Sequence, residues 1–172
     1  MKYIIGFVVL LLLSGCSVVE LFKLKPVVDS AVTAQTYVGL QEREHRHEIK
    51  QLIGVDPVRV EWCAAFVNAI LELDGIPSLN SIGHPYPLTA RGFLTWGSPV
   101  EIQDIRRGDI VVFPRGNQGW QGHVGFFVAS VTVSGQESWI ILGGNQDQSV
   151  SYAFFRPHQA IGIRRYITPL AP

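Results

Sequence analysis

Cys63 and His123 are the two side chains whose type and setting best suit nucleophilic catalysis. Cys63 lies at the start of an apolar segment with helical spacing, where free backbone N–H groups and the positive end of the helix dipole stabilise a thiolate. A thiol with its ordinary pKa of about 8.5 is only about 3% ionised at pH 7, so a helix start near an imidazole is expected to activate it. His123 lies between glycines in a strand-like segment, where another backbone or a substrate can approach closely. A buried structural cysteine and a core histidine are the alternative interpretations.

A cysteine–histidine pair usually needs a third polar group that orients the imidazole. Asn145, which follows Gly143-Gly144 at the end of a predicted strand, is the first candidate. Gln146 and Asp147 are the alternatives. Gly-Gly-Asn is also a good turn sequence, so a turn with no catalytic role is open as well.

The other histidines give no sign of a metal centre. His45 and His47 are two residues apart, and such a pair points to different sides of a helix, which indicates a solvated face. The sequence therefore predicts neither a metal site nor a cofactor.

The segments that must position these residues change in character along the chain. Apolar residues recur at three- and four-residue steps over residues 62–73, which predicts a helix that Asp74-Gly75 ends. Shorter helices are predicted at residues 41–53 and 88–96. After Gly97, β-branched and aromatic runs separated by turn signals predict strands near residues 109–113, 123–133, 139–142, 149–155 and 161–167. Helices first and strands afterwards predict an α+β fold, with the helices packed on an antiparallel sheet.

Composition narrows the function further. The chain has 172 residues, of which 47% are apolar and 16% charged, and its 14 basic side chains balance 14 acidic ones. This length suits one domain, and the aromatic content supplies a core. Nucleic-acid binding is not expected, because neutralising phosphates needs a basic excess.

The N-terminal segment is expected to lie outside that domain. Ten residues, 4–13, form an unbroken hydrophobic stretch, too short to cross a bilayer but suited to a secretory signal. They lead into Leu13-Ser14-Gly15-Cys16, which resembles the bacterial lipobox. The resemblance implies a signal peptide at 1–15, acylation of Cys16, and a lipid-anchored tether at 16–40. Ser17 after this cysteine implies an outer-membrane lipoprotein facing the periplasm if the host is Gram-negative. An ordinary signal peptide is the alternative.

Lipidation of Cys16 would also determine whether the chain can form an intramolecular disulfide. Cys16 and Cys63 are the two cysteines of the sequence, so an acylated Cys16 leaves no partner for an intramolecular disulfide.

Four short motifs in order resemble one enzyme family. They are Trp62-Cys63-Ala64-Ala65-Phe66-Val67-Asn68, Gly108-Asp109-Ile110-Val111-Val112-Phe113, Gly122-His123-Val124-Gly125-Phe126 and Gly143-Gly144-Asn145-Gln146. Together they resemble the bacterial and phage cell-wall cysteine peptidases of the CHAP and NlpC type, in the papain-like superfamily, with a domain at residues 41–168.

The resemblance implies a role for each matched residue. Cys63 takes the position of the nucleophile, His123 that of the general base, and Asn145 that of the orienting residue. Many CHAP members carry a Glu two residues before the Asn, and Gly143 stands there in this chain. Asp109 matches a Gly-Asp turn residue, which we interpret as structural.

The implied activity is hydrolysis of an amide bond in peptidoglycan, as an endopeptidase or an amidase. Trp62 and Trp120 are expected to contact substrate, although a packing role for Trp120 is equally compatible with the sequence. The expected partners are peptidoglycan and, through Cys16, a membrane. Two other functions stay open: a non-catalytic wall-binding or envelope-structural lipoprotein with the same fold, and acyl or peptidyl transfer by the same Cys–His pair.

Overall fold

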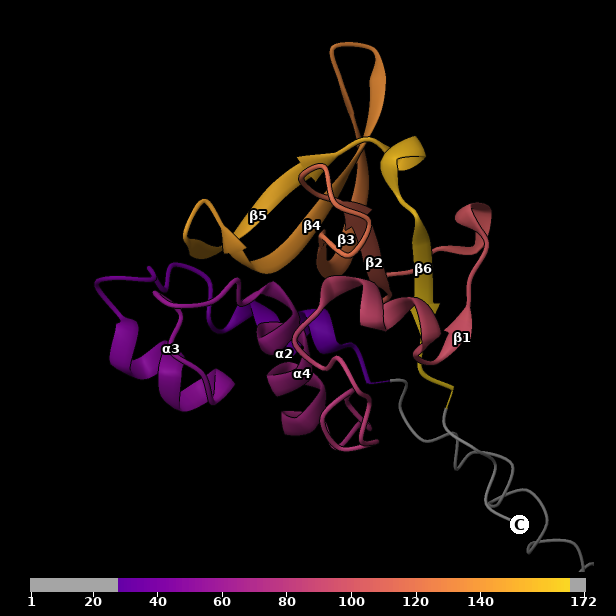
Figure 1. Ribbon diagram of the computed structural model, residues 1–172. Coiled ribbons are helices and arrows are strands. Elements are labelled where there is room, and N and C mark those ends of the chain that lie inside the picture. Colours follow the sequence, from indigo (N-terminus) through magenta and orange to yellow (C-terminus); the bar gives the residue numbers. More distant parts are fainter. Residues whose placement is uncertain (1–27, 168–172) are drawn as a thin grey trace, which may run out of the picture.

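Six antiparallel strands form one sheet in the computed structural model, which describes residues 28–167 (Figure 1). The strand order is β1-β6-β2-β3-β4-β5, and the long β3–β4 hairpin projects beyond the rest of the sheet. The strands are β1 (Ser98–Pro99), β2 (Ile110–Pro114), β3 (Gly122–Val133), β4 (Gln136–Gln146), β5 (Ser149–Phe155) and β6 (Gly162–Arg165).

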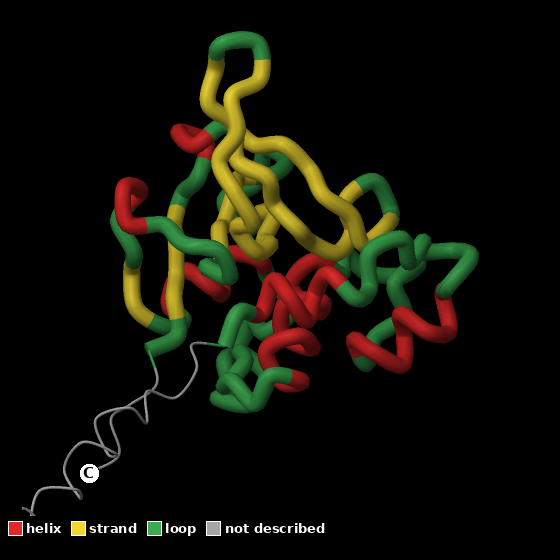
Figure 2. Tube along the Cα trace, turned by 180° about the vertical axis from the view of Figure 1, so that it is seen from behind, coloured by secondary structure: helices red, strands yellow, loops and turns green. Residues whose placement is uncertain are grey.

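Within residues 28–167, three α-helices gather on one side of this sheet (Figure 2). They are α2 (Ser30–Gln35), α3 (Arg46–Ile53) and α4 (Cys63–Leu73), and short 3₁₀ helices lie at Ala90–Thr95, Ile102–Asp104 and Pro157–Gln159. The α+β fold with helices on an antiparallel sheet, predicted from the sequence, is confirmed. None of the helices in residues 28–167 combines the length and apolar character needed to span a membrane.

Helix α4 forms the centre of the larger core. Its residues from Cys63 to Leu71 are all buried, and they pack against Val124, Phe126 and Leu142 of strands β3 and β4. Gly144 makes this close approach possible. A Cβ atom at Gly144 would lie 2.5 Å from the Trp62 ring and 2.7 Å from the Phe66 Cβ, so no larger residue fits there without a shift of the helix.

The opposite face of the sheet holds a smaller core of Val111, Phe113, Phe127, Trp139, Ile141 and Ile163. The Phe113 ring of β2 stacks on Phe155 of β5 at a centroid distance of 4.1 Å. Because β3 and β4 lie between these two strands in the sheet order, this contact shows that the sheet curls back on itself.

The predicted tether at residues 16–40 extends too far into the folded part. Ala31 and Ala34 of α2 are fully buried in the main core. Backbone hydrogen bonds also join Gly39 and Leu40 to Val150 of β5. Residues 16–40 show no clean periodicity in the sequence, because α2 spans only six residues. Residues 1–27, with the predicted signal peptide and Cys16, lie outside the described residues.

Asp109 has the structural role expected of it. Its carboxylate is buried, accepts two hydrogen bonds from the Arg165 guanidinium at 2.6 and 2.7 Å, and also accepts from the Arg106 backbone N–H. It thus fixes the entry of β2 to the neighbouring strand β6.

Candidate active site

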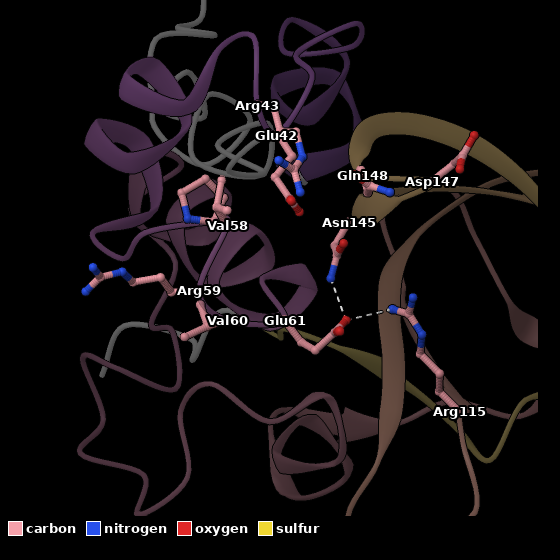
Figure 3. A pocket seen from close by; sticks show the side chains of 11 residues that line it. Glu42, Arg43, Val58, Arg59, Val60, Glu61, Arg115, Asn145, Asp147 and Gln148 are labelled. Atoms are coloured by element: carbon pink, nitrogen blue, oxygen red, sulfur yellow. Dashed lines mark hydrogen bonds and ion pairs between the residues drawn. The ribbon is translucent and has the colours of Figure 1, made fainter.

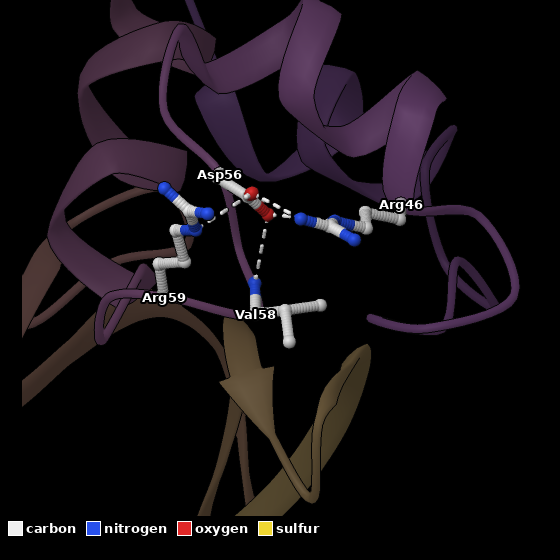
Figure 4. A network of polar contacts seen from close by, with 4 residues as sticks. All are labelled: Arg46, Asp56, Val58 and Arg59. Atoms are coloured by element: carbon white, nitrogen blue, oxygen red, sulfur yellow. Dashed lines mark hydrogen bonds and ion pairs between the residues drawn. The ribbon is translucent and has the colours of Figure 1, made fainter.

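Cys63 is the first residue of α4, as expected from the sequence. The loop before it is braced by Asp56, which pairs with Arg46 of α3 and with Arg59, and accepts a hydrogen bond from the Val58 backbone N–H at 3.3 Å (Figure 4). The Arg46 hydrogen bond holds the pKa of Asp56 down at about 2, so this brace stays charged at neutral pH. These contacts of Asp56 therefore hold the loop that precedes α4, and with it the first turn of the helix, in a fixed position.

The Cys63 thiol is more buried than the sequence suggests. Only 4% of the residue is exposed, and this burial raises the pKa of the thiol. Three other contributions lower the pKa of the thiol: hydrogen bonding from the Val124 and Ala64 backbone amides and the positive charge of Arg115. Together they are smaller than the effect of burial. The expectation of a lowered thiol pKa was wrong, because loss of solvation outweighs the helix end.

His123 lies at the start of β3, one residue before Val124, and is 5% exposed. Its ring stacks on Phe155 at a centroid distance of 5.6 Å with an angle of 12° between the planes. Burial lowers the pKa of His123 to about 4, although the Gln146 hydrogen bond raises it. The imidazole is therefore neutral at pH 7, and so is the thiol.

The polar side chain that contacts the imidazole of His123 is Gln146. Its Oε1 atom lies 3.0 Å from His123 Nε2, and its Nε2 atom donates to the carbonyl oxygens of Ile141 and Ser151. Because both carbonyls accept from the amide nitrogen, the amide oxygen must face the imidazole. His123 then carries its proton on Nε2, which leaves Nδ1 unprotonated and able to accept a proton.

The prediction of Asn145 for this place is wrong, and the alternative Gln146 holds it. Asn145 instead donates from Nδ2 to Glu61 Oε2 at 2.6 Å. The reason is a bulge in β4: Gly143 and Gln146 are three residues apart, whereas their partners Ser151 and Ser149 on β5 are two apart. This extra residue reverses which of two neighbouring side chains faces His123. Asn145 has the left-handed φ of 57° that the bulge requires.

A charged pocket of about 600 Å³ adjoins the start of α4 (Figure 3). Glu61 is central to it, because it accepts from Asn145 and pairs with Arg115 Nη1 at 3.2 Å. Three acidic and three basic side chains line the pocket: Glu42, Glu61, Asp147, Arg43, Arg59 and Arg115. Glu61 and Arg115 were not predicted from the sequence: no motif marks them, because they meet only in the folded chain.

The two tryptophans predicted to contact substrate, Trp62 and Trp120, differ in their exposure to solvent. Trp62 is fully buried, donates from Nε1 to Glu42 Oε2 at 3.0 Å and packs edge-on against Phe66, so its predicted substrate contact is wrong. It is a core residue that fixes the start of α4. Trp120 is 67% exposed in the loop before β3, and its contact with substrate stays a prediction.

Solved structures supply the comparison for this fold, since no protein-family model and no curated protein matches the sequence. An NlpC/P60 family protein from Bacillus cereus ATCC 10987 superposes with a TM-score of 0.51 and 17% identity, over 82% of this chain and 41% of that one. NlpC1 from Trichomonas vaginalis superposes with a TM-score of 0.49 and 21% identity, over 80% and 42%. The chain thus spans about two fifths of the length of these structures. It shares its α+β fold with the NlpC/P60 family protein from Bacillus cereus.

Proposed function

We propose that the protein is a cysteine hydrolase that cleaves an amide bond of peptidoglycan, within the stem peptide or between sugar and peptide. The observation that carries the proposal is the buried His123–Gln146 hydrogen bond of 3.0 Å, which leaves His123 Nδ1 free at the start of β3. The Val124 amide, one residue further, acts on the Cys63 sulfur, so the helix start and the strand start meet at the thiol. The NlpC/P60-like fold supports peptidoglycan as the substrate.

The neutral state of both groups defines the mechanism. His123 Nδ1 removes the proton from Cys63 as the sulfur attacks the amide carbon, so the thiolate forms only during the reaction. The same nitrogen then gives this proton to the leaving amine, and water releases the acyl group from sulfur. The Cys63 backbone N–H, free at the first position of α4, is one donor to the oxyanion.

The experiment is digestion of purified sacculi by the wild type and by Cys63→Ala. We expect the wild type to release soluble fragments and Cys63→Ala to release none while it unfolds at about the same temperature, because the change removes a thiol and no large core side chain. Mass spectrometry of the fragments identifies the bond. Digestion by Cys63→Ala contradicts the covalent mechanism.

The second candidate is a non-catalytic envelope protein, and the 4% exposure of Cys63 favours it. A wild type that leaves sacculi intact but sediments with them supports this function. A wild type that digests them excludes it.

The proposed location is the bacterial cell envelope, with the chain anchored by a lipid on Cys16. The lipobox-like residues 13–16 support it. Cys16→Ser is expected to stop incorporation of labelled fatty acid and to leave the precursor unprocessed. Labelled fatty acid on Cys16→Ser, or none on the wild type, contradicts the anchor.

A further inference from the structure

Two pockets adjoin the candidate site and share a boundary. The charged pocket of Figure 3 lies against Val60 and Glu61, which lead into α4. A second pocket, of about 320 Å³, lies against His123 and Gln146 on the sheet. Three residues line both pockets: Arg115, Asn145 and Asp147. These residues therefore form the boundary between the two pockets.

The Cys63 thiol is closed off from both pockets. Cys63 lines neither of them, and only 4% of this residue is exposed. Glu61, two residues before it, lines the charged pocket alone, whereas His123 lines the second pocket alone. A substrate amide must reach the sulfur and the imidazole at the same time. A chain that does so has to cross the boundary between the pockets, so this boundary must open during the proposed reaction.

An ion pair closes the boundary. Glu61 Oε2 pairs with Arg115 Nη1 at 3.2 Å and accepts a hydrogen bond from Asn145 Nδ2 at 2.6 Å (Figure 3). The pair joins the loop before α4 to the loop between β2 and β3, and Asn145 holds the carboxylate from the bulge of β4. Three segments around the site are thus tied together at one oxygen atom.

This ion pair lies close to both reacting groups. Burial has the largest effect on the pKa of Cys63 and of His123, but the positive charge of Arg115 lowers both pKa values and the negative charge of Glu61 raises them. Because water and salt screen charges that are far apart, both members of the pair must lie near the thiol and the imidazole.

The pair is also weak enough to open. The Glu61 side chain is 75% exposed and that of Arg115 is 47% exposed. An exposed pair of this kind favours the paired form by about 5-fold at most, and by less at high salt. The pair is therefore expected to open and close at equilibrium without unfolding of the domain.

We propose that the Glu61–Arg115 ion pair is a gate that divides one substrate groove into the two pockets and closes it beside Cys63. When the pair opens, the two pockets join and the sulfur becomes accessible. As a regulation of the candidate site, this inference rests on the proposed function. The gate itself concerns access to the thiol, so it can be tested without any substrate.

The experiment measures this access with iodoacetamide, a small neutral reagent that alkylates the thiolate. The rate of labelling at about pH 8 is read by mass spectrometry from the peptide that contains Cys63, in the full chain, so that Cys16 does not contribute.

Arg115→Met separates the gate from a simple effect of charge. Loss of the positive charge alone raises the pKa of the Cys63 thiol and slows labelling. Loss of the gate makes labelling faster, and we expect an increase of about 3- to 5-fold at low salt. Arg43→Met is the matched control, because Arg43 lines the same charged pocket but does not pair with Glu61. Its labelling rate is expected to equal that of the wild type.

Salt opens the gate without any substitution. The wild type is expected to label about 3- to 5-fold faster in about 1 M than in about 10 mM sodium chloride, because screening weakens the exposed pair. Arg115→Met, which lacks the pair, is expected to show no such increase. If Arg115→Met unfolds at a lower temperature than the wild type, the salt dependence of the wild type decides alone.

Unchanged or slower labelling of Arg115→Met, or a wild-type rate that does not rise with salt, overturns the proposal. Digestion of sacculi by a protein that behaves in this way contradicts the gate and leaves the hydrolase function intact. The expected labelling pattern in a protein that digests no sacculi supports the gate and contradicts hydrolysis alone.

Discussion

Gln146 orients the imidazole of His123 through a buried hydrogen bond of 3.0 Å, and both hydrogens of the Gln146 amide are used by carbonyl oxygens of β4 and β5. A glutamine held in this way cannot rotate to present its nitrogen to the ring. The tautomer of His123 is therefore set by the backbone of the two strands.

Gln146→Ala is expected to lower kcat by about 10- to 1,000-fold with little change in KM, because an orienting residue positions the base without entering the covalent chemistry. Asn145→Ala is the matched control, with a loss below about 5-fold, since its partner Glu61 is exposed and such contacts contribute about 1 kcal/mol at most. Kinetics on sacculus fragments check both variants. A severe loss in Asn145→Ala beside normal turnover in Gln146→Ala contradicts the assignment.

Alkylation of the Cys63 thiol reports its protonation state. In a chain that starts after Ser17, Cys63 is the one cysteine, so iodoacetamide reports on it alone. We expect slow labelling at pH 6–7 that accelerates only above the ordinary thiol pKa, because burial raises the pKa of Cys63.

The control for this prediction is His123→Ala, which is expected to leave the pH profile of labelling unchanged, because a neutral imidazole does not stabilise a thiolate. Labelling in urea gives the rate of the accessible thiol. Fast labelling of the folded wild type at pH 6 contradicts the neutral pair.

Stability is expected to fall between pH 6.5 and 4. The unfolded chain protonates His123 near pH 6.5, whereas burial lowers the pKa of the folded state to about 4. In this window the unfolded state binds more protons, so the free energy of unfolding decreases as the pH falls, by up to about 3 kcal/mol. Urea unfolding at pH 7 and pH 5 measures the change. His123→Gln, which does not titrate, should show a smaller decrease, and an identical decrease contradicts the lowered pKa.

Gly144→Ala tests the contact between helix and sheet. The new Cβ meets the Trp62 ring at 2.5 Å, and overpacking of this kind costs about 1–3 kcal/mol. Gly119→Ala is the matched control, since a Cβ there has no atom within 4 Å. Thermal unfolding of the two variants gives the comparison, and equal midpoints contradict a tight approach at Gly144.

The sequence predicts those parts of the molecule that depend on local pattern. The helical spacing after Trp62 and the β-branched runs near His123 place Cys63 and His123 correctly on α4 and β3. These two elements are long and strongly periodic, so their ends follow from the residues within them.

Other features depend on contacts that spacing does not encode. The bulge between Gly143 and Gln146 decides which amide reaches His123, and neither residue type reveals it. Trp62 is expected from the sequence to contact substrate, but it is fully buried, and a Cβ at Gly144 would lie against its ring. Burial also reverses the expected shift of the Cys63 pKa, because the degree of burial is a property of the whole fold.

The segment at residues 39–42 protects the outer edge of β5. It bonds along the first half of this strand, from Glu42 N–H to the Gln148 carbonyl at 2.7 Å and between Leu40 and Val150 at 2.9 Å. A shortened chain that starts at residue 41, the domain boundary that the sequence suggests, loses most of this cover. The bare strand edge, with Phe154 exposed beside it, then becomes a template for intermolecular β-pairing and aggregation. A shortened chain that is to avoid this pairing must therefore keep residues 39–42.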